Sequence, residues 1–155
     1  MSYPEFYNKV PELELYDPLA DFLGASEKGI MHYSYLDCVK TAGHSCPTIA
    51  GAYLLVSKAL STLYPDSTPV RGGIRIEFRD ALKDGVVGVI SNLMTQVTGA
   101  TKESGFKGIA GNFVRHSLMD FEVEMKGMLR FTRLDNLASI ELDYSPIPPN
   151  ERQNI

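Results

Sequence analysis

The chain has few of the features that mark secreted proteins, membrane proteins or zinc ribbons. It contains no tryptophan and only two cysteines, Cys38 and Cys46, among 155 residues. Without a Cys-x-x-Cys pair, a zinc ribbon and a thioredoxin-type site are excluded, and a permanent disulfide is not expected in a reducing compartment. No apolar run approaches the roughly 18 residues that span a bilayer. The first residues, Met1 to Glu5, lack the basic and then apolar layout of a secretory signal. We therefore expect a cytoplasmic protein without a membrane partner.

An excess of positive charge is also missing. Lysine and arginine total 15 against 19 for aspartate and glutamate, so the formal net charge is −4 and the pI is about 5.3. This balance argues against a broad nucleic-acid surface, and no nucleic-acid partner is expected. Hydrophobic residues make up 44% and charged residues 22%, as in an ordinary globular protein. We expect one domain over residues 1–145, followed by a proline-rich tail over 146–155.

Apolar spacing predicts helices mainly in the first two thirds of the chain. Prolines divide the first 25 residues into short helical pieces, and residues 30–41 are predicted to form a second helix. The strongest helical pattern follows Cys46, because apolar residues recur there at steps of three and four. These residues are Ile49, Tyr53, Val56, Leu60 and Leu63. A further helix is expected over residues 86–94, with Asp84 as its cap, although the valines there also allow a strand.

Strands are predicted mainly in the last third. Residues 73–79 alternate isoleucine or phenylalanine with charged residues, which is typical of a half-buried strand. Further strands are expected around residues 109–114, 121–125, 128–134 and 139–144. Early helices and late strands predict an α+β fold, with N-terminal helices followed by a mostly antiparallel sheet in a single domain.

One short segment combines an imidazole and a thiol directly before the strongest helix. It reads Gly43-His44-Ser45-Cys46-Pro47. Proline is favoured at the first helical position, so Cys46 is expected to cap the helix. A thiol there faces free N–H groups and the positive end of the helix dipole, and both favour the thiolate. Imidazole and thiolate on one loop are a sound start for a transition-metal site.

Cys38 extends this pair to a Cys-x5-His-x-Cys pattern. If residues 30–41 form a helix, the following loop can bring Cys38 back towards Cys46. Three protein ligands and one open position describe a catalytic zinc site, whereas a fourth ligand would make the site structural. Candidates for the fourth ligand are His116, His32, Asp37 and Asp84. Soft thiolates with imidazole favour zinc first, then iron, nickel or copper(I).

The same residues also have simpler interpretations. A lone cysteine is most often a small buried hydrophobe, so Cys38 also suits the core. Cys46 also suits a helix cap without further chemistry. His116 follows Arg115 in an expected strand, which favours a position facing solvent or a partner. Two further alternatives are a metal-free thiol with His44 as its base and a thiolate that binds haem iron.

A second candidate segment is the turn Thr98-Gly99-Ala100-Thr101, close to lysines. Such a loop can wrap an anionic ligand with its backbone N–H groups. It lacks the Gly-x4-Gly-Lys-Ser/Thr pattern of a P-loop. The expected substrate-binding residues are Thr98, Gly99, Thr101 and Lys107. The alternative is a plain surface turn with solvated lysines.

These motifs resemble those of the formylmethanofuran dehydrogenase E-subunit-like family. That family carries a Gly-His-x-Cys-Pro motif before a helix rich in small residues, matched here by Gly43 to Pro47. It also has an acidic residue that opens a helix and a Thr-Gly-x-Thr turn, which Asp84 and Thr98 to Thr101 match. Lys107-Gly108 is a weaker match to its lysine–glycine segment. The resemblance spans roughly residues 35–115.

The resemblance implies a core-only relative with an α+β fold and an intertwined homodimer. Ala42 and Ala100 stand where the family often has a histidine and a cysteine, and the four-cysteine zinc finger of some relatives is missing. The function expected is a transition-metal protein, zinc first, with a small-molecule pocket at the His44–Cys46 site. The family name points to one-carbon metabolism, but whether the chain is an enzyme stays open. A metal sensor or an accessory protein of a larger complex is the alternative.

Overall fold

The computed structural model describes residues 3–144, and the expected tail over 146–155 lies outside them. The helices are η1 (Glu5–Lys9), α1 (Pro18–Leu23), η2 (Glu27–Gly29), α2 (Tyr35–Ala42), α3 (Pro47–Leu63) and α4 (Val87–Thr98), where η marks a 3₁₀ helix. The strands are β1 (Leu13–Tyr16), β2 (Ile30–Tyr33), β3 (Ile74–Phe78), β4 (Met119–Asp120), β5 (Leu129–Arg133) and β6 (Ser139–Leu142). This is a single α+β domain, as the sequence predicts. No helix among the described residues is both long and apolar enough to cross a bilayer.

The larger sheet has the strand order β4-β3-β5-β6, and its strands lie between residues 74 and 142. The β3–β5 and β5–β6 pairs are antiparallel, and the short β3–β4 pair is parallel. The strand expected over residues 73–79 is confirmed. Its side chains alternate as predicted, with Ile74, Ile76 and Phe78 buried and the charged residues between them only partly exposed.

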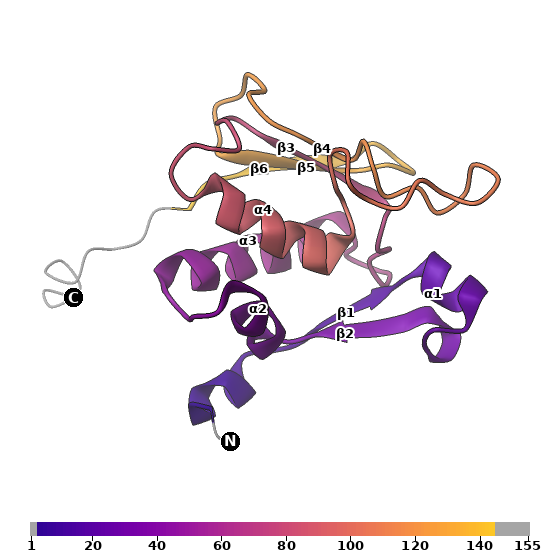
Figure 1. Ribbon diagram of the computed structural model, residues 1–155, viewed down its shortest axis with the longest axis horizontal. Helices are drawn as coiled ribbons and strands as arrows, with labels where there is room; N and C mark the ends of the chain where they lie inside the picture. Colours follow the sequence, from indigo (N-terminus) through magenta and orange to yellow (C-terminus); the bar gives the residue numbers. More distant parts are fainter. Residues whose placement is uncertain (1–2, 145–155) are drawn as a thin grey trace, which may run out of the picture.

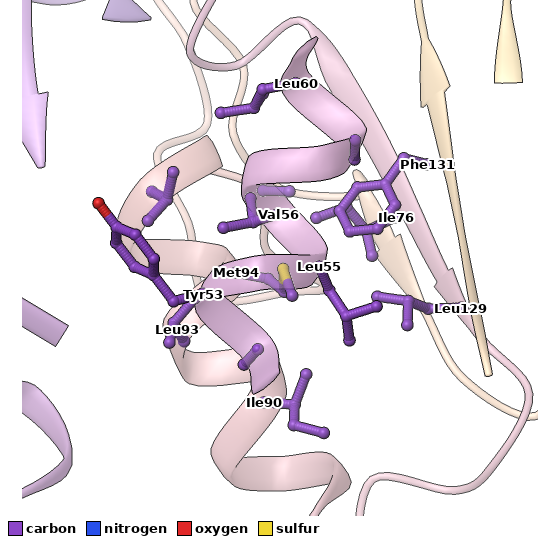
Figure 2. Close-up of a cluster of buried hydrophobic side chains, with 14 of the residues drawn as sticks. Tyr53, Leu55, Val56, Leu60, Ile76, Ile90, Leu93, Met94, Leu129 and Phe131 are labelled. Atoms are coloured by element: carbon purple, nitrogen blue, oxygen red, sulfur yellow. The ribbon is translucent and has the colours of Figure 1, made fainter. Parts of the chain in front are cut away.

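Helices α3 and α4 pack together on one face of this sheet, and α2 and the β1–β2 hairpin lie on the far side of the helices (Figure 1). The core fills the space between these helices and the sheet. Figure 2 shows Val56 and Leu60 of α3 and Ile90 and Met94 of α4 in the same cluster as Phe131 of β5. The predicted helix after Cys46 is therefore confirmed, and its apolar stripe is the centre of the fold.

The N-terminal third contains a hairpin that the helical interpretation missed. Strands β1 and β2 pair antiparallel, with Leu15 opposite Met31. The prediction of a continuous helix over residues 30–41 was therefore wrong for its first part, and α2 begins at Tyr35. The physical reason is the capping box at Ser34, whose hydroxyl accepts from the N–H of Asp37 while the Asp37 carboxylate accepts from the N–H of Ser34. This box starts the helix after the strand has ended.

Three further predictions need correction. Residues 109–114 form no strand, because positive φ angles at Ala110, Gly111 and Phe113 turn the backbone repeatedly. The segment 121–125 is not a strand either, although Phe121 stacks on Phe78 at 5.1 Å between ring centroids. Asp84 is not the cap of α4, because its carboxylate accepts from the N–H of Ala81 and the helix begins only at Val87.

Candidate functional site

The Gly43–Pro47 segment forms the tight connection between α2 and α3. Helix α2 ends at Gly43, whose φ of 85° lies in the left-handed region that suits glycine. The Ser45 hydroxyl lies 2.7 Å from the hydroxyl of buried Tyr35, which anchors the loop to the core. Cys46 then occupies the N-cap position of α3, with Pro47 at the first helical position, as the sequence predicts.

His44 is exposed, and one of its two ring nitrogens is already engaged. Its Nδ1 lies 3.2 Å from the carbonyl oxygen of Ala42. Because a carbonyl can only accept, neutral His44 carries its proton on Nδ1 and leaves the Nε2 lone pair free. A backbone carbonyl on the second nitrogen is the usual way in which metal-binding histidines are oriented. The same tautomer also suits a general base.

The electrostatics at Cys46 favour its thiolate. Partial burial raises the pKa of the Cys46 thiol, but the backbone N–H groups of Ile49 and Thr48 and the His44 side chain lower it by more, so the net shift is downward. The Cys46 side chain makes no capping hydrogen bond, and the partial positive charge of the N–H groups at the start of α3 favours the thiolate. A partly exposed, acidified thiol is the form that binds metals or attacks electrophiles.

Cys38 has the opposite environment. It lies on α2 with 1% of its surface exposed, as part of the core. Burial, and to a lesser extent Asp37, raises the pKa of Cys38 to about 12. The thiol of Cys38 is therefore protonated at neutral pH, which fits the simpler of its two interpretations.

A small pocket lies beside His44 and Cys38. It has a volume of about 140 Å³ and lies between α2, the following loop, the start of α3 and α4. Its walls include Cys38, His44, Asn92 and Gln96. The Gln96 amide donates to the carbonyl of Asp37, while its buried Oε1 has no partner among the described residues. The volume is close to that of an engineered protein cavity that holds benzene, so the pocket admits a small molecule.

A complete set of metal ligands does not form within residues 3–144. No group of three or more His, Cys, Asp or Glu side chains there could hold a metal ion. His116 lies in the loop before β4 rather than in a strand, and its Nδ1 is 2.9 Å from the Ser117 hydroxyl. His32 pairs with Glu14 across the hairpin at 3.0 Å. Of the expected ligands, the described structure therefore keeps only His44 and Cys46 together on one loop, which is fewer than a zinc site needs.

The Thr98–Thr101 turn uses most of its polar groups to hold the fold. The buried Thr98 hydroxyl donates to Met94 O and accepts from the N–H of Ala100. Gly99 ends α4 with a left-handed φ of 79°. The Thr101 hydroxyl donates to Arg115 O at 2.8 Å. Of the four expected substrate-binding residues, Thr101 lines a separate pocket of about 480 Å³, and Lys107 is exposed.

The sequence interpretation missed a buried cluster of charges. Asp17 is 4% exposed, and its carboxylate accepts from Arg115 at 2.7 Å and from Arg71 at 3.1 Å. The same carboxylate caps α1 by accepting from the N–H groups of Leu19 and Ala20. The Asp17-Pro18 pair is an N-cap signal of the same kind as Cys46-Pro47, but nothing in the local sequence points to the distant arginines.

Comparison of the chain with protein-family models, with curated proteins and with solved structures finds no match. The fold and the site define an α+β domain. In it, a thiol at a helix N-cap and an imidazole held by a backbone carbonyl share one loop, beside a small pocket.

Proposed function

We propose that this chain is a cytoplasmic protein that binds a soft transition-metal ion, zinc first, through Cys46 and His44. The observation that carries the proposal is the His44 ring, whose Nδ1 is held by the Ala42 carbonyl, next to a thiol whose pKa is lowered. Lewis-acid polarisation of a ligand oxygen is the chemistry that such an ion supplies when bound. A small molecule in the pocket beside His44 would present that oxygen.

The missing ligands come from outside a single chain in this proposal. Zinc needs at least three protein ligands in a catalytic site, and the described residues offer two. The resemblance to formylmethanofuran dehydrogenase E-subunit-like proteins implies a homodimer, and in such a dimer a second copy of the chain would supply the remaining zinc ligands. The Gly43–Pro47 motif supports this relationship. A sensor or accessory role is included here, because an exposed His44 suits an exchangeable ion.

A metal-free thiol is the second candidate, and the incomplete ligand set favours it. In that case the Nε2 of His44 takes the proton of Cys46, and the thiolate attacks an electrophilic carbon in a small molecule. A new S–C bond forms, and the leaving group departs with the electrons of the bond that breaks. Cys38, with a pKa of about 12, takes no part.

Cobalt substitution of the protein, purified without a histidine tag, tests the first candidate. Co²⁺ bound by a thiolate gives a sulfur-to-metal charge-transfer band, so the spectrum reports the ligand directly. We expect the band in the wild type and in Cys38→Ala, and its loss in Cys46→Ala. His44→Ala should weaken uptake by about tenfold or more, because it removes one of two ligands of the chain. Sedimentation with and without metal tests the homodimer.

Alkylation by iodoacetamide at neutral pH separates the remaining outcomes. The absence of a charge-transfer band in every variant overturns the metal proposal. Rapid alkylation of Cys46, with Cys38 unmodified, then supports the thiol candidate. If Cys46 is neither a ligand nor reactive, both candidates fail and the residue is a helix cap only.

A further inference from the structure

The buried cluster of Asp17, Arg71 and Arg115 holds more positive than negative charge. One carboxylate faces two guanidinium groups; the side chains of Asp17 and Arg115 are 6% and 7% exposed, and that of Arg71 is 21% exposed. An excess charge in such a place is costly unless another group compensates it. The cluster therefore needs a second negative or electron-rich group close to one of its two arginines.

Arg71 is compensated within the fold. Its Nη1 donates to Asp17, and its Nη2 donates to the carbonyl of Gln96 at 2.8 Å. That carbonyl belongs to the last turn of α4, where the helix dipole is negative. The guanidinium also lies over the ring of Tyr33, 5.4 Å from its centroid. These contacts satisfy the charge of Arg71 on several sides.

Arg115 is not compensated to the same extent. Its Nη2 donates to Asp17 at 2.7 Å, but its buried Nε has no acceptor among the described residues. Burial lowers the pKa of Arg115 despite the neighbouring carboxylate. A Cβ atom on Gly72 would collide with the guanidinium, so the group lies directly against glycine backbone. The guanidinium therefore keeps a positive charge for which Arg115 has only the carboxylate that it shares with Arg71, and an anion bound nearby would balance that charge.

A pocket lies beside the same two arginines. Its volume is about 280 Å³, and its walls include Arg71, Arg115, Gly73, Asn112 and Phe113. It is separate from the pocket beside His44, with which it shares no lining residue. The walls present two cations, an exposed amide side chain and an aromatic ring, and no carboxylate. This combination suits a small molecule that carries an oxyanion.

We propose that the pocket between Arg71 and Arg115 binds a small molecule through a phosphate or carboxylate group, which supplies the negative charge that the cluster lacks. The site does not depend on the proposed metal function. Arginine is the residue best suited to it, because its planar fork matches the geometry of phosphate and carboxylate oxygens.

Binding of inorganic phosphate, measured by calorimetry and by the Arg115 Nε–H signal in NMR spectra, tests this proposal. We expect phosphate to shift that signal and to raise the melting temperature, while sodium chloride at equal ionic strength does neither. Acetate, added in parallel, distinguishes a preference for carboxylate from one for phosphate. Arg115→Gln should weaken binding of the preferred anion by about tenfold or more, since it removes a charge-assisted donor.

Asn112 provides a test that leaves the buried cluster intact. It is exposed on the wall of the pocket, so Asn112→Asp and Asn112→Lys change the charge there without disturbing the core. The first should weaken binding by about threefold or more, and the second should strengthen it. Asn8→Asp, an exposed change of the same kind in η1, is the matched control and should have no effect. No binding of phosphate or acetate, or equal binding by all three Asn112 forms, overturns the proposal.

Discussion

Removal of the Asp17 charge should be among the most damaging single changes in this protein. Asp17→Asn keeps a good N-cap residue for α1 but leaves Arg71 and Arg115 without their shared carboxylate. Loss of one partner from a buried ion pair costs about 3–5 kcal/mol, because the remaining charge stays buried. That is a large part of the roughly 5–15 kcal/mol by which a typical domain is stable. Asp17→Ala should cost about 1 kcal/mol more, because it also removes the cap.

Urea unfolding followed by far-UV circular dichroism measures these changes in a chain without tryptophan. With a slope of about 2 kcal/mol per molar, Asp17→Asn should lower the midpoint by roughly 2 M. The matched control is Asp80→Asn, which removes the carboxylate from an exposed pair with Arg79 and should change the midpoint little. A loss below about 1 kcal/mol for Asp17→Asn would refute the reasoning.

Acid provides a second check on Asp17. Burial raises the pKa of this carboxyl, but the N–H of Ala20 and the two arginines lower it by more, so it lies below the ordinary value of 3.8. The contribution of Asp17 to stability is therefore complete above pH 3.8 and is lost as the pH falls through the folded-state pKa. The difference between wild type and Asp17→Asn should shrink in that acid range, and a constant difference would contradict the charge explanation.

Two further predictions concern the core. Because the pKa of Cys38 rises from 9.0 to about 12 on folding, stability should fall above pH 9 by about 1.4 kcal/mol per unit, and Cys38→Ala should lose that part of the alkaline slope in urea unfolding. If the alkaline pH dependence of stability were the same in Cys38→Ala and the wild type, the Cys38 thiol would not be buried as the structure has it. A Cβ on Gly51 in α3 would collide with the Tyr144 ring, whose hydroxyl donates to Pro47 O at 2.7 Å. Gly51→Ala should therefore destabilise the wild type but stabilise a Tyr144→Ala background by about 0.5–1 kcal/mol through helix propensity, and the same sign in both backgrounds would refute the contact.

The elements best predicted from the sequence are those in which buried residues recur at the regular spacing of a helix or a strand. Helix α3 and strand β3 each bury a regular face against the core, so the period of their apolar residues is visible without knowledge of partners. Strands β1 and β2 are only four residues long, and no residue of β2 is fully buried. Their pairing depends on each other rather than on a local pattern, which explains why the segment was predicted to be helical.

The candidate site divides in the same way. The position of Cys46 follows from the proline after it, so its role as the cap of α3 could be predicted from two adjacent residues. Cys38, eight positions earlier, required knowledge of which face of α2 is buried. The apolar neighbours Tyr35 and Val39 favoured a core position for Cys38, but the sequence left the metal alternative open. The Arg115–Asp17 pair spans 98 positions, and no local pattern reports such a contact.

The two charged regions of this domain should respond to mutation in opposite ways. At the His44–Cys46 loop both side chains are at least partly exposed, and Cys46 makes no capping hydrogen bond to α3, so changes there should cost little stability. At the Asp17–Arg115 cluster the charges are buried and join α1 to the loop before β4, so a change in charge alters stability and anion binding together. Separate measurement of folding and binding is therefore essential for the second region. The charge series at exposed Asn112 makes that separation, because it changes the field in the pocket while the buried ion pairs remain intact.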